Sequence, residues 1–293
     1  MPLLRRFAKN MLYLTKDLVN NVNELNTISE GLTRLNNEIN GKMRRLNARK
    51  ESLPEILSHD GRNKLQASVL EAQTPWQDIE LQTPKIPGMI TDEERQYYAY
   101  IGQFYSGKGE VVELGPWLGR STSCILVGLL ENQMFSGKRL HVFDDFVWRA
   151  RWMKNFVEKD EQLENHQDFR HLFDKYTGPF KDHMLVKRRK ITTYDGNENV
   201  AQLEWSGQPV EILYVDCGRL YHTNEAWYQI FSKAFIPNTT LIVMQDWRLQ
   251  FEVPILWENQ TKNFTDSKGK SLQLVHELKN GTIATFLYRV LPQ

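Results

Sequence analysis

The chain has 293 residues, of which 41% are hydrophobic and 25% are charged, and its formal net charge is +1. This length suffices for one α/β domain of about 200 residues together with an additional segment. A net charge so close to zero argues against a general nucleic-acid-binding protein, so we expect no nucleic-acid partner. The two cysteines, Cys124 and Cys217, provide no disulfide framework and favour a reducing compartment.

Membrane insertion and secretion are both disfavoured by the hydrophobic pattern. No apolar run reaches the roughly 18 residues that a membrane-spanning helix needs, and the N-terminus lacks the apolar core of a signal peptide. We therefore expect a soluble, cytoplasmic protein without a transmembrane segment.

Residues 1–73 are predicted to form a helical segment. Apolar residues recur there at intervals of seven, at Leu4, Met11, Leu18, Leu25, Leu32, Ile39 and Leu46. A stripe of this length predicts a coiled coil that joins copies of the chain into a homo-oligomer. A single long helix packed on its own domain explains the same pattern, so both arrangements stay open. A linker with several prolines, residues 74–90, precedes the main domain, residues 91–293.

The main domain is predicted to open with a helix. The segment from Thr91 to Glu94 has the Thr-x-x-Glu pattern of a capping box, and the helix should run to about Tyr105 and stop at Gly107. Because it precedes the first strand, this helix is placed to cover a cleft at the end of that strand.

A glycine-containing turn then joins a short strand to an apolar helix. The sequence from Glu113 to Thr122 reads ELGPWLGRST. Gly115 and Gly119 allow the backbone to approach a ligand closely, and the helix start after them offers free N–H groups. The spacing is not that of the dinucleotide-binding fingerprint, because Trp117 lies in the region where a second glycine would stand.

Further strands are predicted at residues 139–143, 184–190, 210–215 and 240–244, with a helix from about Asn224 to Phe235. Residues 272–278 and 282–288 flank Asn280 and Gly281, which predicts a tight hairpin. Strands that alternate with helices indicate an α/β fold with a mainly parallel sheet. Ligands bind at the carboxyl ends of the strands in such sheets.

Acidic residues follow the second and third strands. Asp144 and Asp145 end the second strand, where a carboxylate accepts hydrogen bonds from ribose hydroxyls in nucleotide-binding α/β folds. Either residue fits, and Asp144 is the first choice because it directly follows the apolar run. Asp195 lies after the third strand and is placed to approach an adenine, although an Asp-Gly turn explains it slightly better.

The fourth and fifth strands carry the candidates for catalysis. Asp216, Arg219 and His222 follow the fourth strand, and Asp246 follows the fifth. His222 is a candidate general base because its unperturbed pKa lies near neutrality. Asp216 and Asp246 offer the oxygen ligands that Mg²⁺ prefers.

The pattern E-x-G-x-x-x-G-x-S-T, which includes Ser121, resembles the first motif of class I S-adenosylmethionine-dependent methyltransferases. The likeness extends over roughly residues 90–290. It implies a Rossmann-like methyltransferase sheet with a C-terminal antiparallel hairpin, preceded here by the long helix or coiled coil. It also implies that S-adenosylmethionine binds with Glu113 facing its methionine moiety. Trp117 is a candidate for contact with the sulfonium, although packing between strand and helix explains it better.

Three positions depart from the family pattern. Cys217 replaces a glycine, Arg219 replaces a histidine, and Gln245 replaces the first aspartate of an Asp-Asp pair. Counterparts of Asp216 and Asp246 bind Mg²⁺ in metal-dependent relatives such as the macrocin and catechol O-methyltransferases. Here the lost carboxylate and the added arginine weaken the case for a metal, so a metal-free site in which Arg219 orients an acidic acceptor competes with a Mg²⁺ site.

The resulting prediction is a macrocin-like O-methyltransferase that acts on a hydroxyl of a sugar, a glycoside or another small molecule. His222, Asp216 and Arg219 are its catalytic candidates. The alternative is a non-catalytic, methyltransferase-like binding or assembly module, which the three departures favour. Residues 147–182 form an insertion rich in aromatic and basic side chains, and acceptor binding and helical core packing explain it equally well.

Overall fold

The computed structural model describes residues 74–248, 260–278 and 280–290, all within the unit Ser58–Gln293. The expected N-terminal helix or coiled coil, residues 1–73, lies outside the described residues. The helices among the described residues are too short or too polar to cross a bilayer.

The described residues form a seven-stranded sheet in the order β3-β2-β1-β4-β5-β7-β6. Its strands are β1 Glu110–Leu114, β2 Leu140–Asp144, β3 Met184–Arg188, β4 Val210–Val215, β5 Leu241–Met244, β6 Leu272–Glu277 and β7 Ala284–Tyr288. The first five are parallel, whereas β7 pairs antiparallel with both β5 and β6. The predicted α/β sheet, parallel in its first five strands and completed by a C-terminal antiparallel hairpin, is therefore confirmed.

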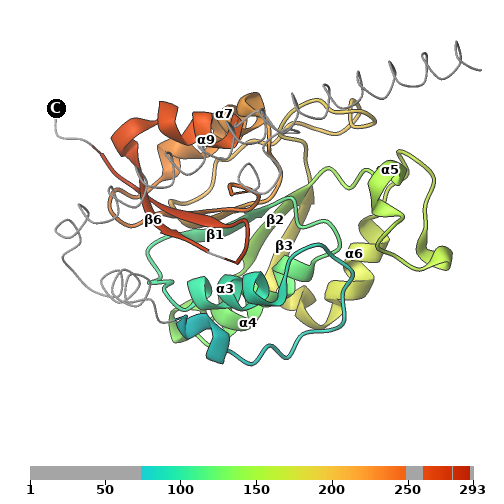
Figure 1. The fold of residues 1–293 in the computed structure, drawn as a ribbon, viewed down its shortest axis with the longest axis horizontal. Coiled ribbons are helices and arrows are strands. Elements are labelled where there is room, and N and C mark those ends of the chain that lie inside the picture. The colour runs from blue at the N-terminus through green and yellow to red at the C-terminus, as the bar shows by residue number, and fades with distance from the viewer. Residues whose placement is uncertain (1–73, 249–259, 279, 291–293) are drawn as a thin grey trace, which may run out of the picture. The chain divides into compact units, whose positions relative to one another are not determined.

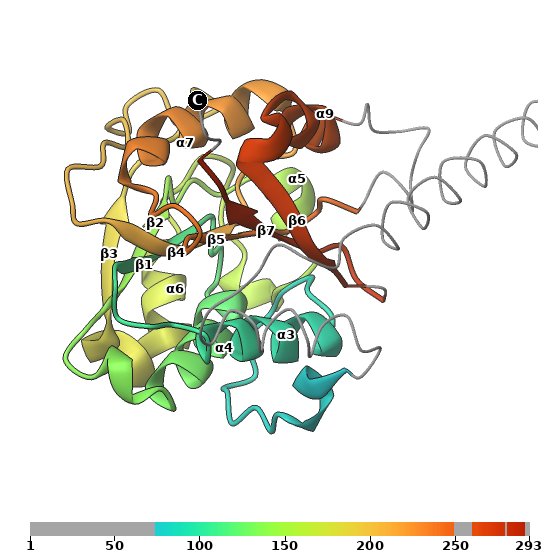
Figure 2. The ribbon, with the colours of Figure 1, turned by 90° about the vertical axis from the view of Figure 1, so that its left-hand side faces the viewer.

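Helices cover both faces of the sheet. The α-helices of the described residues are α3 Asp92–Gly102, α4 Arg120–Leu130, α5 Ala150–Met153, α6 Arg170–Thr177, α7 Tyr221–Phe231 and α9 Gln260–Ser267. Short 3-10 helices are η1 Pro75–Asp78, η2 Gln133–Phe135, η3 Lys159–Glu161, η4 Gly178–His183, η5 Ser232–Ala234 and η6 Gly269–Ser271. In both ribbon views α3 and α4 lie on one face and α7 and α9 on the other (Figures 1 and 2).

The central strand β4 is buried over its whole length. Its one charged residue, Glu211, is stabilised by loop residues that precede β1. Its carboxylate accepts the backbone N–H groups of Ser106 at 2.6 Å and Lys108 at 2.7 Å, and the hydroxyl of Ser106 at 2.8 Å. A buried carboxylate is tolerated when its oxygens are satisfied in this way.

Helix α3 begins with the predicted capping box. Thr91 Oγ1 accepts the N–H of Glu94 at 3.2 Å, and Glu94 Oε2 accepts the N–H of Thr91 at 2.8 Å. The helix ends at Gly102, earlier than the predicted stop at Gly107. The linker predicted at residues 74–90 packs onto α3, because its Trp76 is buried with its ring centroid 5.2 Å from that of Tyr97.

The terminal hairpin has a longer turn than its Asn-Gly pair predicts. Leu278 N donates to Ile283 O at 2.9 Å, so the loop between them spans residues 279–282, of which 279 is not described. The loop folds over the start of α3, because Thr282 donates its N–H and its hydroxyl to Glu94 Oε1 at 2.8 and 2.9 Å. A Cβ on Gly281 would lie 2.8 Å from Glu94 Cγ, so this glycine permits close approach.

Candidate functional site

The carboxyl ends of four parallel strands are joined by backbone hydrogen bonds that continue past the strands. Gly115 N donates to Phe143 O, Asp216 N to Leu114 O and Gln245 N to Val215 O, each at 2.9 Å. The strand order reverses direction between β1 and β4, and at such a point an α/β sheet opens a crevice for ligands. The predicted site residues that follow β1, β2, β4 and β5 therefore all lie at the same end of the sheet, where the carboxyl ends of these strands meet.

The turn from β1 to α4 depends on its two glycines. Gly115 has a φ of +81° and Gly119 a φ of +89°, a region that other residues rarely adopt. A Cβ on Gly115 would lie 2.5 Å from the carbonyl oxygen of Asp216. A Cβ on Gly119 would lie 2.2 Å from Thr177 Cγ2. The first glycine thus lets the ends of β1 and β4 meet, and the second lets the turn pack against α6.

Glu113 lies at the base of this turn and is only 1% exposed. Its two carboxylate oxygens accept the hydroxyls of Ser121 at 2.6 Å and Thr122 at 2.7 Å. Burial raises the pKa of Glu113 to about 7, although the two hydroxyl hydrogen bonds act in the opposite direction. Two predicted cofactor residues, Glu113 and Ser121, are thus bonded to each other, and neither lines the cavity described next.

A cavity of about 770 Å³ opens at the carboxyl ends of the strands. Its size falls in the range of about 300–1,000 Å³ that small-molecule and cofactor sites occupy. Its polar lining includes Asp144, Asp145, Arg149, Asn197, Asp216, Arg219 and Asp246, and its apolar lining includes Met89, Phe143, Trp152, Met153, Phe156 and Ile191. Gly115 contributes backbone to the same wall.

The β2 end of the cavity is built around two adjacent carboxylates. Asp144 Oδ1 accepts the N–H of Phe146 at 2.6 Å. Burial, followed by the charge of Asp145, raises the pKa of Asp144 to about 8. Burial also acts to raise the pKa of Asp145, but hydrogen bonds and the charge of Arg149 hold it below its usual range. Arg149 binds both oxygens of Asp145, at 3.1 and 2.7 Å, and Asn197 adds a bond of 2.8 Å.

Three other predicted cofactor residues, Trp117, Gly119 and Asp195, lie off the cavity wall. Asp195 has an 80% exposed side chain and pairs with His166 at 2.8 Å. Trp117 has a φ of +47°, and its ring lies 5.0 Å from Trp152 and 5.6 Å from Phe156, measured between centroids. Trp117 therefore packs against the insertion, and Asp195 pairs at the surface.

The β4 and β5 end carries Asp216, Arg219 and Asp246. Arg219 donates through Nε to Asp246 Oδ2. Asp246 has a φ of +58°, which is uncommon for a residue with a side chain. Burial, followed by the charge of Asp246, raises the pKa of Asp216 well above its usual range, while Arg219 partly offsets this. Burial likewise raises the pKa of Asp246 against the opposing effect of Arg219.

Gln245 turns away from this group. Its Nε2 donates to Glu94 at 3.0 Å and to Thr282 at 2.7 Å, and its Oε1 accepts the hydroxyl of Tyr98 at 2.7 Å. The residue that replaces the family's aspartate thus ties the end of β5 to α3 and the terminal hairpin.

These residues do not fit a Mg²⁺ site. The cation prefers an octahedral set of oxygen ligands, but Asp246 is already bonded to a guanidinium and Gln245 is turned away. Within the described part of the chain, no group of three or more His, Cys, Asp or Glu side chains is arranged to hold a metal ion.

His222 is exposed in the first turn of α7 and does not line the cavity. The helix was expected to begin near Asn224 but begins at Tyr221. Residues Thr223 and Asn224 are consequently the ones that turn inward and become buried. The structure therefore does not bring His222 together with Asp216.

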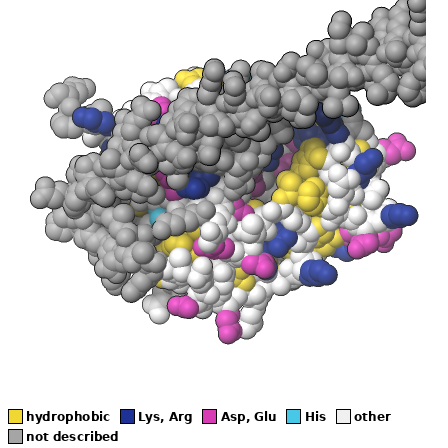
Figure 3. Space-filling model, in the orientation of Figure 1, with side chains coloured by type: hydrophobic (Ala, Val, Ile, Leu, Met, Phe, Trp, Pro, Cys, Tyr) yellow, Lys and Arg dark blue, Asp and Glu magenta, His cyan; other side chains and the backbone are white. Residues whose placement is uncertain are grey.

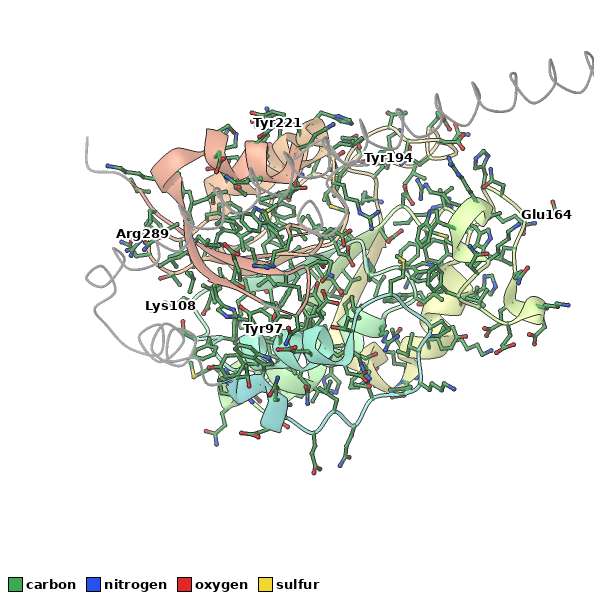
Figure 4. All side chains as sticks on the ribbon, viewed as in Figure 1. Tyr97, Lys108, Glu164, Tyr194, Tyr221 and Arg289 are labelled. Atoms are coloured by element: carbon green, nitrogen blue, oxygen red, sulfur yellow. The ribbon has the colours of Figure 1, made fainter. Side chains whose placement is uncertain are left out.

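Several cavity residues had no motif in the sequence. Arg149 follows Asp145 by four positions, but both residues precede α5, so the ion-pair spacing of helices does not account for their contact. Tyr194 follows β3 and reaches α7, where its hydroxyl lies 2.5 Å from Thr223 Oγ1. Figure 4 labels Tyr194 and Tyr221, the first residue of α7, in the upper part of the view. Asn197 gave no signal, because its partner Asp145 is 52 residues away.

The insertion divides into two parts. Four of the aromatic side chains in and beside it are buried and pack on one another: Phe146, Trp148, Phe169 and Phe173. Trp152 and Phe156 instead line the cavity. Some aromatic side chains of the insertion therefore pack in the core, and others lie at the candidate site.

No family model and no curated protein matches the sequence. Among solved structures, the chain is similar to TomG, an O-methyltransferase of Streptomyces achromogenes in complex with S-adenosylmethionine, at 10% identity over 80% of this chain and 93% of that one, with a TM-score of 0.46. It is also similar to the Podospora anserina methyltransferase PaMTH1, at 9% identity, 85% and 96% coverage and a TM-score of 0.43. A third is CalS11, a TDP-rhamnose 3'-O-methyltransferase, at 13% identity, 66% and 78% coverage and a TM-score of 0.39. At these identities and scores we infer neither activity nor substrate from the likenesses.

Proposed function

We propose that the chain is an S-adenosylmethionine-dependent O-methyltransferase that acts on a hydroxyl of a small molecule, such as a sugar or a glycoside. The observation that carries the proposal is the position of Asp144. This carboxylate ends β2 and lines a cavity whose adjoining wall is the Gly115 backbone, at the point where the sheet order reverses. A half-buried carboxylate beside a glycine turn is the arrangement that nucleotide-binding sheets use for a ribose.

The residues at this end fit an adenosyl group. Asp144 would accept hydrogen bonds from the ribose hydroxyls, while Asp145, Arg149 and Asn197 hold the surrounding loop in place. Ile191 and Phe143 offer apolar surface for a base. S-adenosylmethionine supplies an electrophilic methyl group on a sulfonium when it is bound.

The proton of the acceptor hydroxyl must leave as the oxygen–methyl bond forms. We assign the base to Asp216 and not to His222, because Asp216 lines the cavity and has a raised pKa. A raised pKa makes the ionised carboxylate a stronger proton acceptor. Arg219 holds the neighbouring Asp246 through a hydrogen bond, and its charge partly offsets the rise in the pKa of Asp216. No step is assigned to a metal, because the donor set does not fit one.

Calorimetric titration with S-adenosylmethionine and S-adenosylhomocysteine tests the binding part of the proposal. We expect both to bind at one site per chain; binding of neither would refute the proposal. Transfer of a tritium-labelled methyl group to a panel of hydroxylated compounds tests the catalytic part. Asp216→Asn should lower kcat about 100-fold, as loss of a general base does, and leave the Kd of the cofactor within about twofold.

A non-catalytic binding or assembly module is the second candidate. It is supported by the ion pair between Arg219 and Asp246 and by the position of His222 outside the cavity. Cofactor binding without methyl transfer to any compound of the panel would favour this candidate. Added Mg²⁺ should change neither binding nor transfer; a rate that rises with Mg²⁺ and falls on Asp246→Ala would contradict the metal-free assignment.

We further propose that residues 1–73 join copies of the chain and that the protein works in the cytoplasm. The heptad stripe in the sequence supports the first part, and the cysteine usage supports the second. Sedimentation of a chain that starts at residue 71 should reveal a smaller assembly than the full chain forms. If the truncated chain and the full chain form assemblies with the same number of chains, the coiled coil is contradicted.

A further inference from the structure

Large hydrophobic side chains are exposed on one wall of the cavity. Met89 is 51% exposed and Phe156 is 40% exposed, and both line the cavity, as do Trp152 and Met153. We call these four residues the apolar wall. In the space-filling view, hydrophobic side chains gather among charged ones on the side of the molecule where α5 lies (Figure 3). Apolar surface inside a concave site marks the place where a ligand with apolar surface binds.

The apolar wall is held by packing on the turn that forms the proposed cofactor site. Trp152 and Phe156 pack on Trp117, with interplanar angles of 58° and 86°. On the other side, Gly88 O accepts Arg120 Nη1 at 2.9 Å, which fixes the residue preceding Met89 to the start of α4. An aromatic wall anchored in this way is preorganised, so a ligand does not have to order it.

Two arginines of the cavity lining are already paired with carboxylates, whereas Arg189 and Lys190, which also line the cavity, donate to backbone carbonyls. Arg149 binds both oxygens of Asp145, and Arg219 is bonded to Asp246. An anionic ligand would have to compete with these carboxylates. A neutral ligand would leave both pairs intact, and the thioether sulfur of the exposed Met89 favours contact with an aromatic ring.

We propose that the methyl acceptor carries a flat, uncharged aromatic ring that binds on the apolar wall while its hydroxyl reaches toward Asp216. This inference rests on the proposed function, which it deepens by naming the class of acceptor. The acceptor is then a phenol or a compound with an aromatic aglycone, and a bare sugar is a poor substrate.

Binding of 2-naphthol, compared with methyl α-glucoside, tests the inference with the full chain alone and with the chain saturated with S-adenosylhomocysteine. We expect 2-naphthol to bind at least about tenfold more tightly than the glucoside, and Phe156→Ala to weaken 2-naphthol about tenfold. Met89→Gln should also weaken it, and as a change at an exposed side chain it leaves folding intact. Met134→Ala is the matched control, because Met134 is 56% exposed and does not line this cavity.

The outcomes separate this inference from the proposed function. If S-adenosylhomocysteine binds but 2-naphthol does not, or if both wall variants bind 2-naphthol as the unchanged chain does, the inference is overturned and the proposed function stands. If 2-naphthol binds in a manner that depends on Phe156 and Met89 but S-adenosylhomocysteine does not bind, the apolar wall is supported and the methyltransferase is refuted.

Discussion

The two ends of the cavity differ in how their carboxylates are held. At the β2 end, Asp145 receives bonds from Arg149 and Asn197, and Asp144 receives a backbone N–H, so both are fixed by neighbours. At the β4 and β5 end, the pKa of Asp216 is raised well above its usual range by burial and by Asp246. Asp144 and Asp216 thus both have a raised pKa, but the carboxylates of the first end are fixed by neighbouring donors, which suits them to hold a ligand, whereas we assign the proton-accepting role to Asp216 at the second end.

The largest expected effect comes from a change at the point where the two ends meet. Gly115→Ala places a Cβ 2.5 Å from the carbonyl oxygen of Asp216 and must push β1 and β4 apart at their ends. We expect S-adenosylmethionine to bind more than about 100-fold more weakly, as measured by calorimetry.

Gly137→Ala is the matched control for that change. Gly137 has a φ of +71°, but a Cβ there would meet nothing within 4 Å. It should cost on the order of 1 kcal/mol of stability from backbone strain and leave cofactor affinity unchanged. Equal losses of affinity in both variants would show that strain, and not contact between the two ends, is responsible.

The β2 end is tested by Asp144→Asn. The pKa of Asp144 is about 8, so its carboxyl is mostly protonated at pH 7, and ribose hydroxyls that donate to it favour the ionised form. We expect S-adenosylmethionine to release a proton on binding at pH 7 and to bind more tightly as the pH rises toward 8. Calorimetry in buffers of different ionisation enthalpy measures the release.

The variant should bind about tenfold more weakly and release no proton. Asp195→Asn serves as the same chemical change at an exposed carboxylate outside the cavity, and it should keep the affinity within about twofold. Proton release that persists in Asp144→Asn would assign the ribose contact to another residue.

The buried carboxylate beneath the glycine turn gives a smaller effect, on stability. The pKa of Glu113 is about 7, above its ordinary value of 4.5, so the folded chain binds more protons than the unfolded chain between those values. The free energy of unfolding should therefore fall as the pH rises from about 4.5 to 7. Glu113→Gln should reduce this slope by on the order of 1 kcal/mol per pH unit, as urea denaturation at several pH values will measure. An unchanged slope would mean that Ser121 and Thr122 keep the carboxylate ionised.

The smallest effect is expected at the β4 side. His222→Ala should change kcat less than about twofold, because His222 is exposed and lies outside the cavity lining. Rates of methyl transfer for this variant and for Asp216→Asn, measured side by side, identify which residue takes the proton. A large loss in His222→Ala with little loss in Asp216→Asn would reverse our assignment.

The sequence predicted the sheet well because its signals are local. Each parallel strand is a short apolar run that ends in polar or glycine residues, and the capping box at Thr91 lies within one turn of its helix. The site was predicted in part for the same reason. Gly115 and Asp216 follow their strands directly, Asp144 is the last residue of β2, and Asp246 lies two residues after β5; all four line the cavity.

The remaining features depend on contacts that no local pattern encodes. His222 lies outside the cavity because α7 begins at Tyr221, and a shift of a few residues rotates a helix face. Gln245 joins Glu94 and Tyr98, which are 151 and 147 residues away. Aromatic spacing in the insertion could not separate the buried Phe173 from the cavity-lining Phe156, because both fit an amphipathic helix.

A crystal structure of the chain with S-adenosylhomocysteine tests the central claim most directly. We predict that the ribose hydroxyls lie within hydrogen-bond distance of the Asp144 carboxylate and that the adenosyl group lies along the Gly115 turn. The ligand bound elsewhere on the chain, or bound in this cavity with its ribose away from both Asp144 and Asp145, would contradict the account.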